Sequence, residues 1–360
     1  MRLRVGNACW HAHHIFAAAT CKEAGFFAQE GLDVEVVHAR IYAEGLKASR
    51  PGGERYDEVG KVLPDMIEFN IDIICDIHLP TIFNERLLGN DELSIIGGWR
   101  SYFPYCVMAR EGISSIADLK GKRIGEWYRG SQYTIWFERE LRKAGLDPNT
   151  DVQWMTGYRY GSAREAWKPL LAGETDVAVV QNPWVPLLME QGFNKIFDFL
   201  EHHKPHGRPE RVTVARKRFI ERHPELIKRY WKATIRGYQF MRIVPENYPF
   251  QRYVEAKLRV NNPDESERMR PLRGDMSKEG LELMESSFYP LDGKVSVEGV
   301  AKLVEEFKEG GILPQSVSRS DIEEVVRNEL VEEAWAEVSK TDEVKRNLER
   351  LQPVIERYGY

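Results

Sequence analysis

The sequence predicts an α/β protein with two lobes and a helical C-terminal part. Strand and helix patterns alternate along the first half of the chain, as they do in βαβ units. The chain has 360 residues, of which 42% are hydrophobic and 30% charged, enough for two sizeable cores. From about Asn194 onward, helical patterns dominate. Together these observations indicate two α/β units followed by a helical tail.

The first unit is expected to run to about Trp99. Its first helix should end at Gly25, a favourable residue for a left-handed C-cap, and a later helix should begin near Pro80. A long irregular segment, 39–60, interrupts the alternation. The expected strands are 2–7, 32–38, 71–75 and 93–96, and the expected helices are 13–24, 64–69 and the one that begins near residue 80.

The second unit follows the segment Gly97-Gly98-Trp99. Ser114 and Ser115 can cap a short helix that ends at Leu119, and a helix through Ala144 should place its apolar side chains on an inner face. The expected strands are 105–108, 123–127, 151–156 and 176–180, and a further helix is expected over 163–171. The apolar side chains of the helix through Ala144 are Trp136, Phe137 and Leu141.

The tail is expected to consist of helices with solvated charged faces. A basic run, Arg216-Lys217-Arg218, is interpreted as the solvated start of a helix rather than as a phosphate-binding patch. The expected helices are 224–241, 248–258, 297–308, 321–338 and 342–358.

Composition excludes several classes of protein. No apolar run approaches the roughly 18 residues of a membrane-spanning helix. A net charge of −5 gives no general attraction to nucleic acid, so no such partner is expected. Four cysteines without CxxC spacing, Cys9, Cys21, Cys75 and Cys106, are typical of reduced thiols, and no cofactor is expected. The first strand begins within the first two residues, which predicts a cytoplasmic protein. The periplasm is expected only if that start is a processed or engineered one.

Chemically active side chains follow several of the expected strands. In parallel sheets, ligands bind beyond the carboxyl ends of the strands. The segment after the first strand contains Cys9, Trp10, His11, His13 and His14, and the third strand is followed by Asp76 and His78. In the second unit, Gly130-Ser131-Gln132 begins a helix and offers free N–H groups to an anion, although many such turns only cap their helices. Asn182 and Trp184 follow a later strand.

Three segments resemble one known family. Glu23 to Glu35 (EAGFFAQEGLDVE) is similar to a signature of the solute-binding proteins for nitrate, sulfonates and taurine and of their thiamine-pyrimidine-synthase-like relatives. Ile116 to Gly125 and Leu171 to Ala178 resemble two further segments of that family. The resemblance implies a type 2 periplasmic-binding-protein fold with the ligand in a cleft between two lobes. The lobes would be 1–99 with 200–360, and 100–199.

The same resemblance implies a small-molecule binder, which would need a transporter permease as partner if it is exported. A small organic ligand, expected to be a sulfonate, a carboxylate or a heteroaromatic compound, would be held in the cleft by aromatic and polar groups. The residues expected to contact it are Trp10, His11, His14, Asp76, His78, Gly130, Ser131, Gln132, Asn182 and Trp184.

An enzyme on the same fold is the alternative. Aryl sulfinate desulfinases of this fold carry a nucleophilic cysteine just after the first strand, where Cys9 stands, and Arg55 lies in a segment similar to that of their arginine. The glycines that follow the family's arginine are replaced by Asp57 and Glu58, and the family's histidine has no counterpart. Cys9 would then cleave a C–S bond, or a C–C bond as in related decarboxylases. The pyrimidine synthases fit less well, because their cysteine-rich motif is absent.

Other roles remain open for the same residues. His11 or His14 could lower the pKa of Cys9 from about 8.5 toward neutrality, but the more common role of such a cysteine is as a small residue that packs at a strand end. His11 shares a face with His14 in a helix or with His13 in a strand, and either pair with Cys9 or His78 could also bind zinc or iron. His202 and His206 are interpreted as part of a solvated loop.

Segment 39–60 is longer than the corresponding connection in the transport family. It is interpreted as a lid or as a surface insertion. As a lid, it would bring Arg55 to a carboxylate, sulfinate or sulfonate of the ligand.

Overall fold

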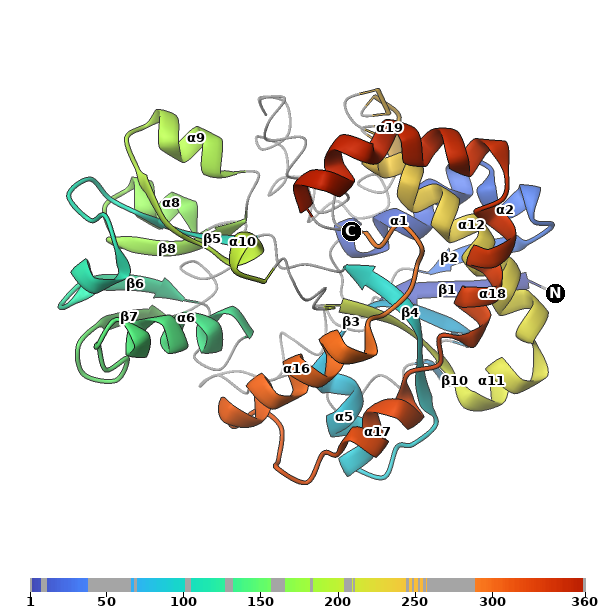
Figure 1. The fold of residues 1–360 in the computed structure, drawn as a ribbon, viewed down its shortest axis with the longest axis horizontal. Coiled ribbons are helices and arrows are strands. Elements are labelled where there is room, and N and C mark those ends of the chain that lie inside the picture. The colour runs from blue at the N-terminus through green and yellow to red at the C-terminus, as the bar shows by residue number, and fades with distance from the viewer. Residues whose placement is uncertain are drawn as a thin grey trace.

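The computed structural model contains two five-stranded mixed sheets that lie side by side, each with its own helices (Figure 1). The predicted α/β class with a helical C-terminal part is confirmed. The structure describes residues 2–7, 12–37, 66–67, 70–100, 105–126, 132–156, 166–181, 184–203, 209, 211–243, 246–247, 249–251, 253–254, 257 and 289–358. The predicted lid 39–60 and most of the expected helix 64–69 lie outside these residues. Of the expected helix 248–258, residues 249–251, 253–254 and 257 are described, and all of them are helical.

The first sheet has the strand order β2-β1-β3-β10-β4. Strand β1 is parallel to β2 and β3, as βαβ units require, whereas β10 enters antiparallel between β3 and β4. The chain therefore leaves this sheet after β4 and returns to its interior as β10. The strands are β1 (Arg2–Asn7), β2 (Asp33–Val37), β3 (Ile73–His78), β4 (Leu93–Arg100) and β10 (Arg211–Arg216).

Helices on the first sheet bury a dense aromatic core. The chain turns at Gly25 with φ 80°, as the sequence predicted. The long helix α12 packs against α1 and α2 and buries Tyr230, Trp231 and Tyr238 completely or nearly so. The helices are α1 (Ala12–Glu23), α2 (Phe26–Gln29), α5 (Leu79–Leu87), α11 (Lys217–Arg222) and α12 (Pro224–Arg242).

The second sheet has the strand order β7-β6-β8-β5-β9. Its helix α6 buries the side chains of Trp136, Phe137 and Leu141, as predicted from their spacing. The strands are β5 (Tyr105–Ala109), β6 (Arg123–Glu126), β7 (Gln153–Thr156), β8 (Val177–Gln181) and β9 (Asn194–Asp198). The helices are η1 (Ile116–Leu119), α6 (Gln132–Lys143), α8 (Trp167–Leu171), α9 (Val185–Glu190) and α10 (Phe199–His203).

Helices dominate the part after Asn194, as expected, but one expected helix is wrong. The single helix expected over 321–338 is two helices, α17 (Arg319–Val325) and α18 (Glu329–Val338), and strands β9 and β10 occur where no strand was assigned. The break is made by tertiary hydrogen bonds. Arg327 N donates to Ile95 O (2.8 Å), and the Asn328 amide accepts from Val295 N (3.2 Å) and donates to Val295 O (2.7 Å).

The basic run near residue 217 behaves as predicted. Arg216 ends β10, and Lys217 begins α11. Lys217 pairs with Glu324 (3.0 Å), and the largely exposed Arg218 pairs with Glu92 (3.2 Å). These contacts belong to a helix start whose basic side chains have neighbouring carboxylates.

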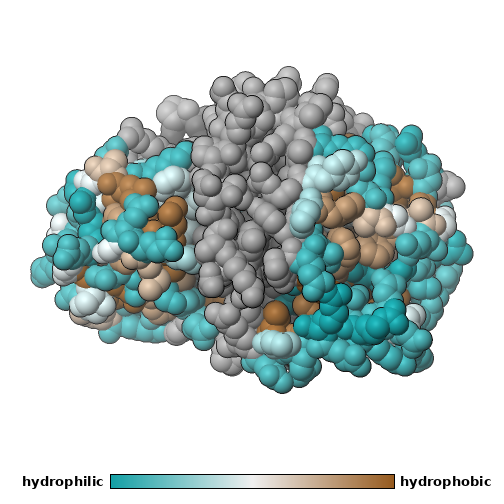
Figure 2. Space-filling model, turned by 90° about the horizontal axis from the view of Figure 1, so that it is seen from above, coloured by the Kyte–Doolittle hydropathy of each residue, from teal (hydrophilic) through white to brown (hydrophobic). Residues whose placement is uncertain are grey.

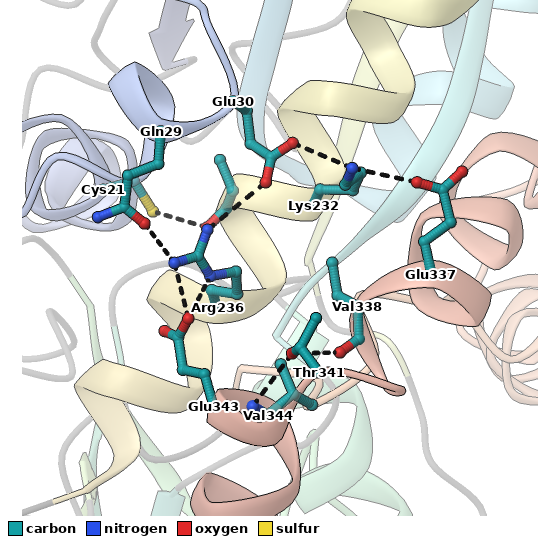
Figure 3. A network of polar contacts seen from close by, with 11 residues as sticks. Cys21, Gln29, Glu30, Lys232, Arg236, Glu337, Val338, Thr341, Glu343 and Val344 are labelled. Atoms are coloured by element: carbon teal, nitrogen blue, oxygen red, sulfur yellow. Dashed lines mark hydrogen bonds and ion pairs between the residues drawn. The ribbon is translucent and has the colours of Figure 1, made fainter.

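The last helices are α16 (Val297–Glu309) and α19 (Asp342–Tyr358), and charged contacts attach α18 and α19 to α12. Lys232 lies between Glu30 (3.2 Å) and Glu337 (3.1 Å), and Arg236 bonds Glu343 (2.7 Å) and Glu30 (3.5 Å), as Figure 3 shows. Seen from above, the described surface on both sides of the molecule is mainly hydrophilic, with apolar patches within each side (Figure 2).

Within the described residues, no helix combines the length with the apolar character that a membrane span requires.

Candidate functional site

The carboxyl end of β3 carries a β-bulge. Val212 of β10 pairs with Ile77, but Val214 pairs with Ile74, so Cys75 and Asp76 together face a single residue of β10. Asp76 is fully buried and has a φ of 65°, a left-handed conformation that a residue other than glycine rarely adopts. Bulges are frequent beside binding sites, where they redirect a side chain. The sequence-predicted residue Asp76 thus occupies a locally strained, buried position.

Asp76 is paired with an arginine from the neighbouring strand. Arg211 Nη1 lies 3.1 Å from Asp76 Oδ1 and donates a hydrogen bond to Asp76 O, also at 3.1 Å. The arginine side chain is only 11% exposed. A partly buried guanidinium is therefore fixed at the start of β10 by both the side chain and the backbone of one residue.

A second arginine lies in register with the first. Arg211 pairs with Arg100 of β4, and Trp99 forms another one-residue irregularity beside this pair. Arg100 is 2% exposed. Its guanidinium carbon lies 5.5 Å from the ring centre of Trp99 and 5.9 Å from that of Tyr105. Such cation–π contacts offset part of the cost of burying a charge.

His78, the other residue predicted here, pairs with Arg211 across the strands. Burial lowers its pKa well below the usual value of 6.5, and the charges of Arg211 and Arg100 lower the pKa further. His78 is therefore neutral at physiological pH. The charges of both arginines act on the same imidazole, so His78 lies beside two cations.

Aromatic rings connect this cluster to the second sheet. Tyr105, the first residue of β5, stacks on Tyr133 with ring centres 5.7 Å apart. Tyr133 lies in the first turn of α6, which begins at Gln132 as predicted. Arg100, Tyr105 and Tyr133 thus form a continuous contact from the end of β4 to the N-terminal end of α6. The buried carboxylate of Glu126 ends β6, the strand that precedes α6.

The remaining predicted site residues are described only in part or not at all. Trp184 is 7% exposed and stacks on Trp167, with ring centres 5.3 Å apart, in an apolar cluster that includes residues of β5 and β8. This packing role does not test its predicted ligand contact. The backbones of His13 and His14 lie in α1 and that of Gln132 in α6, but their side chains are not described. Cys9, Trp10, His11, Arg55, Gly130, Ser131 and Asn182 lie outside the described residues, so their roles stay predictions.

The described thiols are buried and poorly ionised. Cys21, Cys75 and Cys106 are free cysteines. Burial raises the pKa of Cys75 to about 11 and also raises the pKa values of Cys21 and Cys106. None of these three is activated as a nucleophile. Among the residues with described side chains, no group of three or more His, Cys, Asp or Glu is arranged to hold a metal ion.

Sequence reasoning missed Arg100 and Arg211. Arg100 ends the apolar run LSIIGGWR, so a charged residue at the end of a buried strand was an available signal. Arg211 gave no such signal, because β10 itself was not expected.

Comparison with known proteins supports this architecture. Residues 93–248 match the family described as "NMT1/THI5 like". The matched region runs from β4 through the second sheet and α12 to a few residues beyond that helix. A formylaminopyrimidine-binding protein from Halalkalibacterium halodurans is 23% identical over 226 residues, which are 61% of this chain and 60% of the relative. The match thus covers less than two thirds of that curated protein.

Solved structures with the same fold include binding proteins and an enzyme. The periplasmic aliphatic sulphonate binding protein SsuA from Escherichia coli has a TM-score of 0.57 at 16% identity, covering 91% of this chain and 92% of that one. The periplasmic nitrate-binding protein NrtA from Synechocystis PCC 6803 has a TM-score of 0.60 at 13% identity, covering 95% of this chain and 90% of that one. The desulfurization enzyme DSZB has a TM-score of 0.60 at 14% identity, covering 93% of this chain and 99% of that one. The expected resemblance and the periplasmic-binding-protein fold are confirmed.

Proposed function

We propose that this protein binds a small organic oxyanion, a sulfonate or a carboxylate, beside Arg100 and Arg211 between the two lobes. The observation that carries the proposal is the register of these two arginines, which lie opposite each other on β4 and β10 and both act on His78. In folds of this type, ligands bind beyond the carboxyl ends of the strands, and β3 and β4 end here.

The chemistry of the cluster suits an oxyanion. Guanidinium groups present parallel N–H donors that match the oxygens of a carboxylate or sulfonate, and hydrogen bonds between charged groups are the stronger ones. Arg211 is held by Asp76, and Arg100 by two aromatic rings, so little side-chain entropy is lost on binding. The N-terminal end of α6 contributes the positive end of its dipole to the same region.

The relatives suggest which compounds to test. Those compared above are described as binding sulphonate, nitrate or formylaminopyrimidine, and a variant of the desulfurization enzyme was solved with biphenyl-2-sulfinic acid. These likenesses are all below 25% identity, so they guide the choice of probes. The panel is ethanesulfonate, benzenesulfonate, benzoate, nitrate, biphenyl-2-sulfinate and a formylaminopyrimidine.

Thermal shift followed by calorimetry tests the proposal. We expect at least one sulfonate or carboxylate to stabilise the protein, and Arg100→Gln to weaken that binding about tenfold or more, as expected for loss of a charged hydrogen bond. Arg218→Gln is the matched control, because the Arg218 side chain is 75% exposed and pairs only at the surface with Glu92. Arg100→Lys keeps the charge and separates loss of charge from loss of geometry. If no probe binds, or if both glutamine variants bind equally well, the proposal is wrong.

The same panel separates binding from turnover. Incubation with biphenyl-2-sulfinate or the carboxylates, followed by chromatography, should return the probe unchanged if the protein is a binder. Product formation that Cys9→Ser abolishes would instead establish the enzyme alternative.

The proposed function also bears on the cellular compartment of the protein and on a transporter permease as its partner. A cytoplasmic protein stays with the cytoplasmic fraction when cells are fractionated. If it instead stands outside the membrane as the binding component of an ABC-type importer, the periplasmic fraction should contain it, and a permease should co-purify with the ligand-bound form.

A further inference from the structure

The helix α6 contacts both the proposed site and a helix of the C-terminal part. At its N-terminal end, Tyr133 stacks on Tyr105 beside Arg100. One turn further along, Trp136 Nε1 donates to Glu306 Oε2 of α16 at 2.8 Å, and Arg139 Nη1 lies 3.2 Å from Glu306 Oε1. Each carboxylate oxygen of Glu306 therefore accepts from a different residue of α6.

Glu306 is buried at this contact. The residue is 7% exposed, so its charge is largely removed from water and is stabilised by the donors that surround it. The partner Trp136 is itself 3% exposed. Two buried groups and one cation thus fix the rotation of α6 about its own axis, which apolar packing alone would leave less defined.

The two helices also approach closely. A Cβ atom added at Gly310, just after α16, would lie 2.8 Å from Ile135 Cγ2, too near for any residue but glycine without a shift. Ile135, Trp136 and Arg139 occupy neighbouring positions on one face of α6, because residues three and four apart lie side by side. One apolar cluster continues across this contact, with Phe137 from α6 and Leu303 and Phe307 from α16.

On its other side, α16 is attached to the first lobe. It packs against α5 and α17. The residues just before it are hydrogen-bonded to the first sheet and to the turn before α18: Gly98 N donates to Gly293 O (2.8 Å), and Asn328 bonds Val295 twice. Figure 1 shows α16 extending from this lobe toward α6. Through Glu306, the first lobe therefore holds a helix of the second.

We propose that Glu306 is a positioning residue for ligand binding. Glu306 does not contact the ligand. It holds α6 in place, so that the N-terminal end of this helix keeps its position relative to Arg100 and Arg211. This role rests on the proposed function. A preorganised site avoids the free-energy cost of ordering α6 when the ligand binds. Loss of the contacts that Glu306 makes with Trp136 and Arg139 should therefore weaken ligand binding.

Two measurements on the full chain test the proposal. Hydrogen exchange of the α6 amides needs no ligand, and Glu306→Ala should speed exchange in the first turns of α6 by about tenfold, while circular dichroism stays native. Calorimetry with benzenesulfonate should show binding about five- to twentyfold weaker, from the lost charged hydrogen bonds. Glu306→Gln, which keeps one carbonyl acceptor for Trp136, should lie between Glu306→Ala and the unmodified protein.

Glu309→Ala is the matched control. Glu309 is on the same helix and 66% exposed, and its carboxylate lies 3.9 Å from Arg139. It should leave both the exchange rates and the affinity within about twofold of the unmodified protein. If Glu306→Ala lowers the melting temperature but leaves α6 exchange and affinity unchanged, Glu306 is only structural and the proposal is wrong. If the unmodified protein binds no probe, the proposed function fails and the positioning role fails with it, whatever exchange shows of the contact.

Discussion

Arg123 and Asp176 form a bidentate pair that joins β6 to β8. Arg123 Nη2 donates to Asp176 Oδ1 at 2.7 Å and Arg123 Nε to Oδ2 at 3.0 Å, while Arg123 N also donates to Oδ2 at 2.9 Å. The same guanidinium donates to Gly173 O (3.0 Å), where φ is 75°. The two residues come from two sequence segments that resemble the solute-binding family. Their contact gives a physical reason for both segments: together they fix the register of parallel strands.

Asp176→Asn should destabilise the protein by about 1–3 kcal/mol. The amide keeps one acceptor but places an NH2 group against the guanidinium, so at least one charged hydrogen bond is lost. Denaturation in urea, followed by circular dichroism, measures the change. Asp91→Asn is the control, since Asp91 lies in an exposed turn. Equal stabilities of the two variants would contradict the structural role of the pair.

The contribution of Asp176 to the free energy of unfolding should disappear at low pH. The hydrogen bonds from Arg123 are the main reason that the pKa of Asp176 lies below its usual value of 3.8. A carboxyl group whose pKa is lowered by folding stabilises the protein above the unfolded-state pKa, and this stabilisation is lost as the pH falls through the folded-state pKa. The stability difference between the unmodified protein and Asp176→Asn should therefore be constant from pH 5 to 7 and shrink below about pH 4. A difference that stays unchanged at low pH would contradict this assignment.

Elements with local signals could be predicted from the sequence. The glycine at the end of α1, the apolar face of α6 and the serines before η1 act within a few residues. Ser115 and Asp118 do form the reciprocal cap of that short helix. Their structures follow from side chains that meet their partners nearby in the chain, so the periodicity of the sequence contains the necessary information.

Strand β10 had no such signal, and the site depends on it. Its residues RVTVAR are short and flanked by arginines, and they become a strand because β3 and β4 supply hydrogen bonds on both sides. Partners that lie more than a hundred residues away leave no local pattern. Arg211 and Arg100 meet only through this pairing, so the sequence could place Asp76 and His78 at the site but not the cations beside them.

Glu30→Gln should weaken the attachment of the C-terminal helices by about 1–2 kcal/mol. Glu30 is 14% exposed and lies between Lys232 and Arg236, each of which also contacts a carboxylate of α18 or α19 (Figure 3). Neutralising it leaves two half-buried cations of α12 close together with less counter-charge. Urea denaturation should show the loss, and hydrogen exchange in α19 should be faster.

The control for this substitution is Glu323→Gln. Glu323 pairs with Arg319 at 2.8 Å, but the side chains are 60% and 46% exposed, and exposed pairs contribute about 0–1 kcal/mol. The cluster around Glu30 is partly shielded from solvent. Because of this, 0.5 M salt should reduce the stability loss caused by Glu30→Gln less than the loss caused by Glu323→Gln. If both variants lose stability equally, the burial of Glu30 has no energetic consequence.

Gly237→Ala should destabilise the protein although Gly237 lies within helix α12. Alanine in a helix is ordinarily more stable than glycine by about 1 kcal/mol. Here the added Cβ would lie 2.2 Å from Cys21 Sγ of α1, and both helices are held by the surrounding aromatic core. Overpacking of this kind costs about 1–3 kcal/mol, so the sign of the usual preference is reversed.

A double-mutant cycle identifies the atom responsible. Cys21→Ala removes the sulfur, and the nearest remaining atom of residue 21, its Cβ, would lie 3.5 Å from the new methyl group, an ordinary contact. Cys21→Ala alone should cost stability, because Cys21 is fully buried. In that background, however, Gly237→Ala should become neutral or stabilising, with a coupling free energy of about 1–3 kcal/mol measured by urea denaturation. Additive effects of the two substitutions would mean that the clash lies elsewhere and that α1 and α12 are spaced differently from this structure.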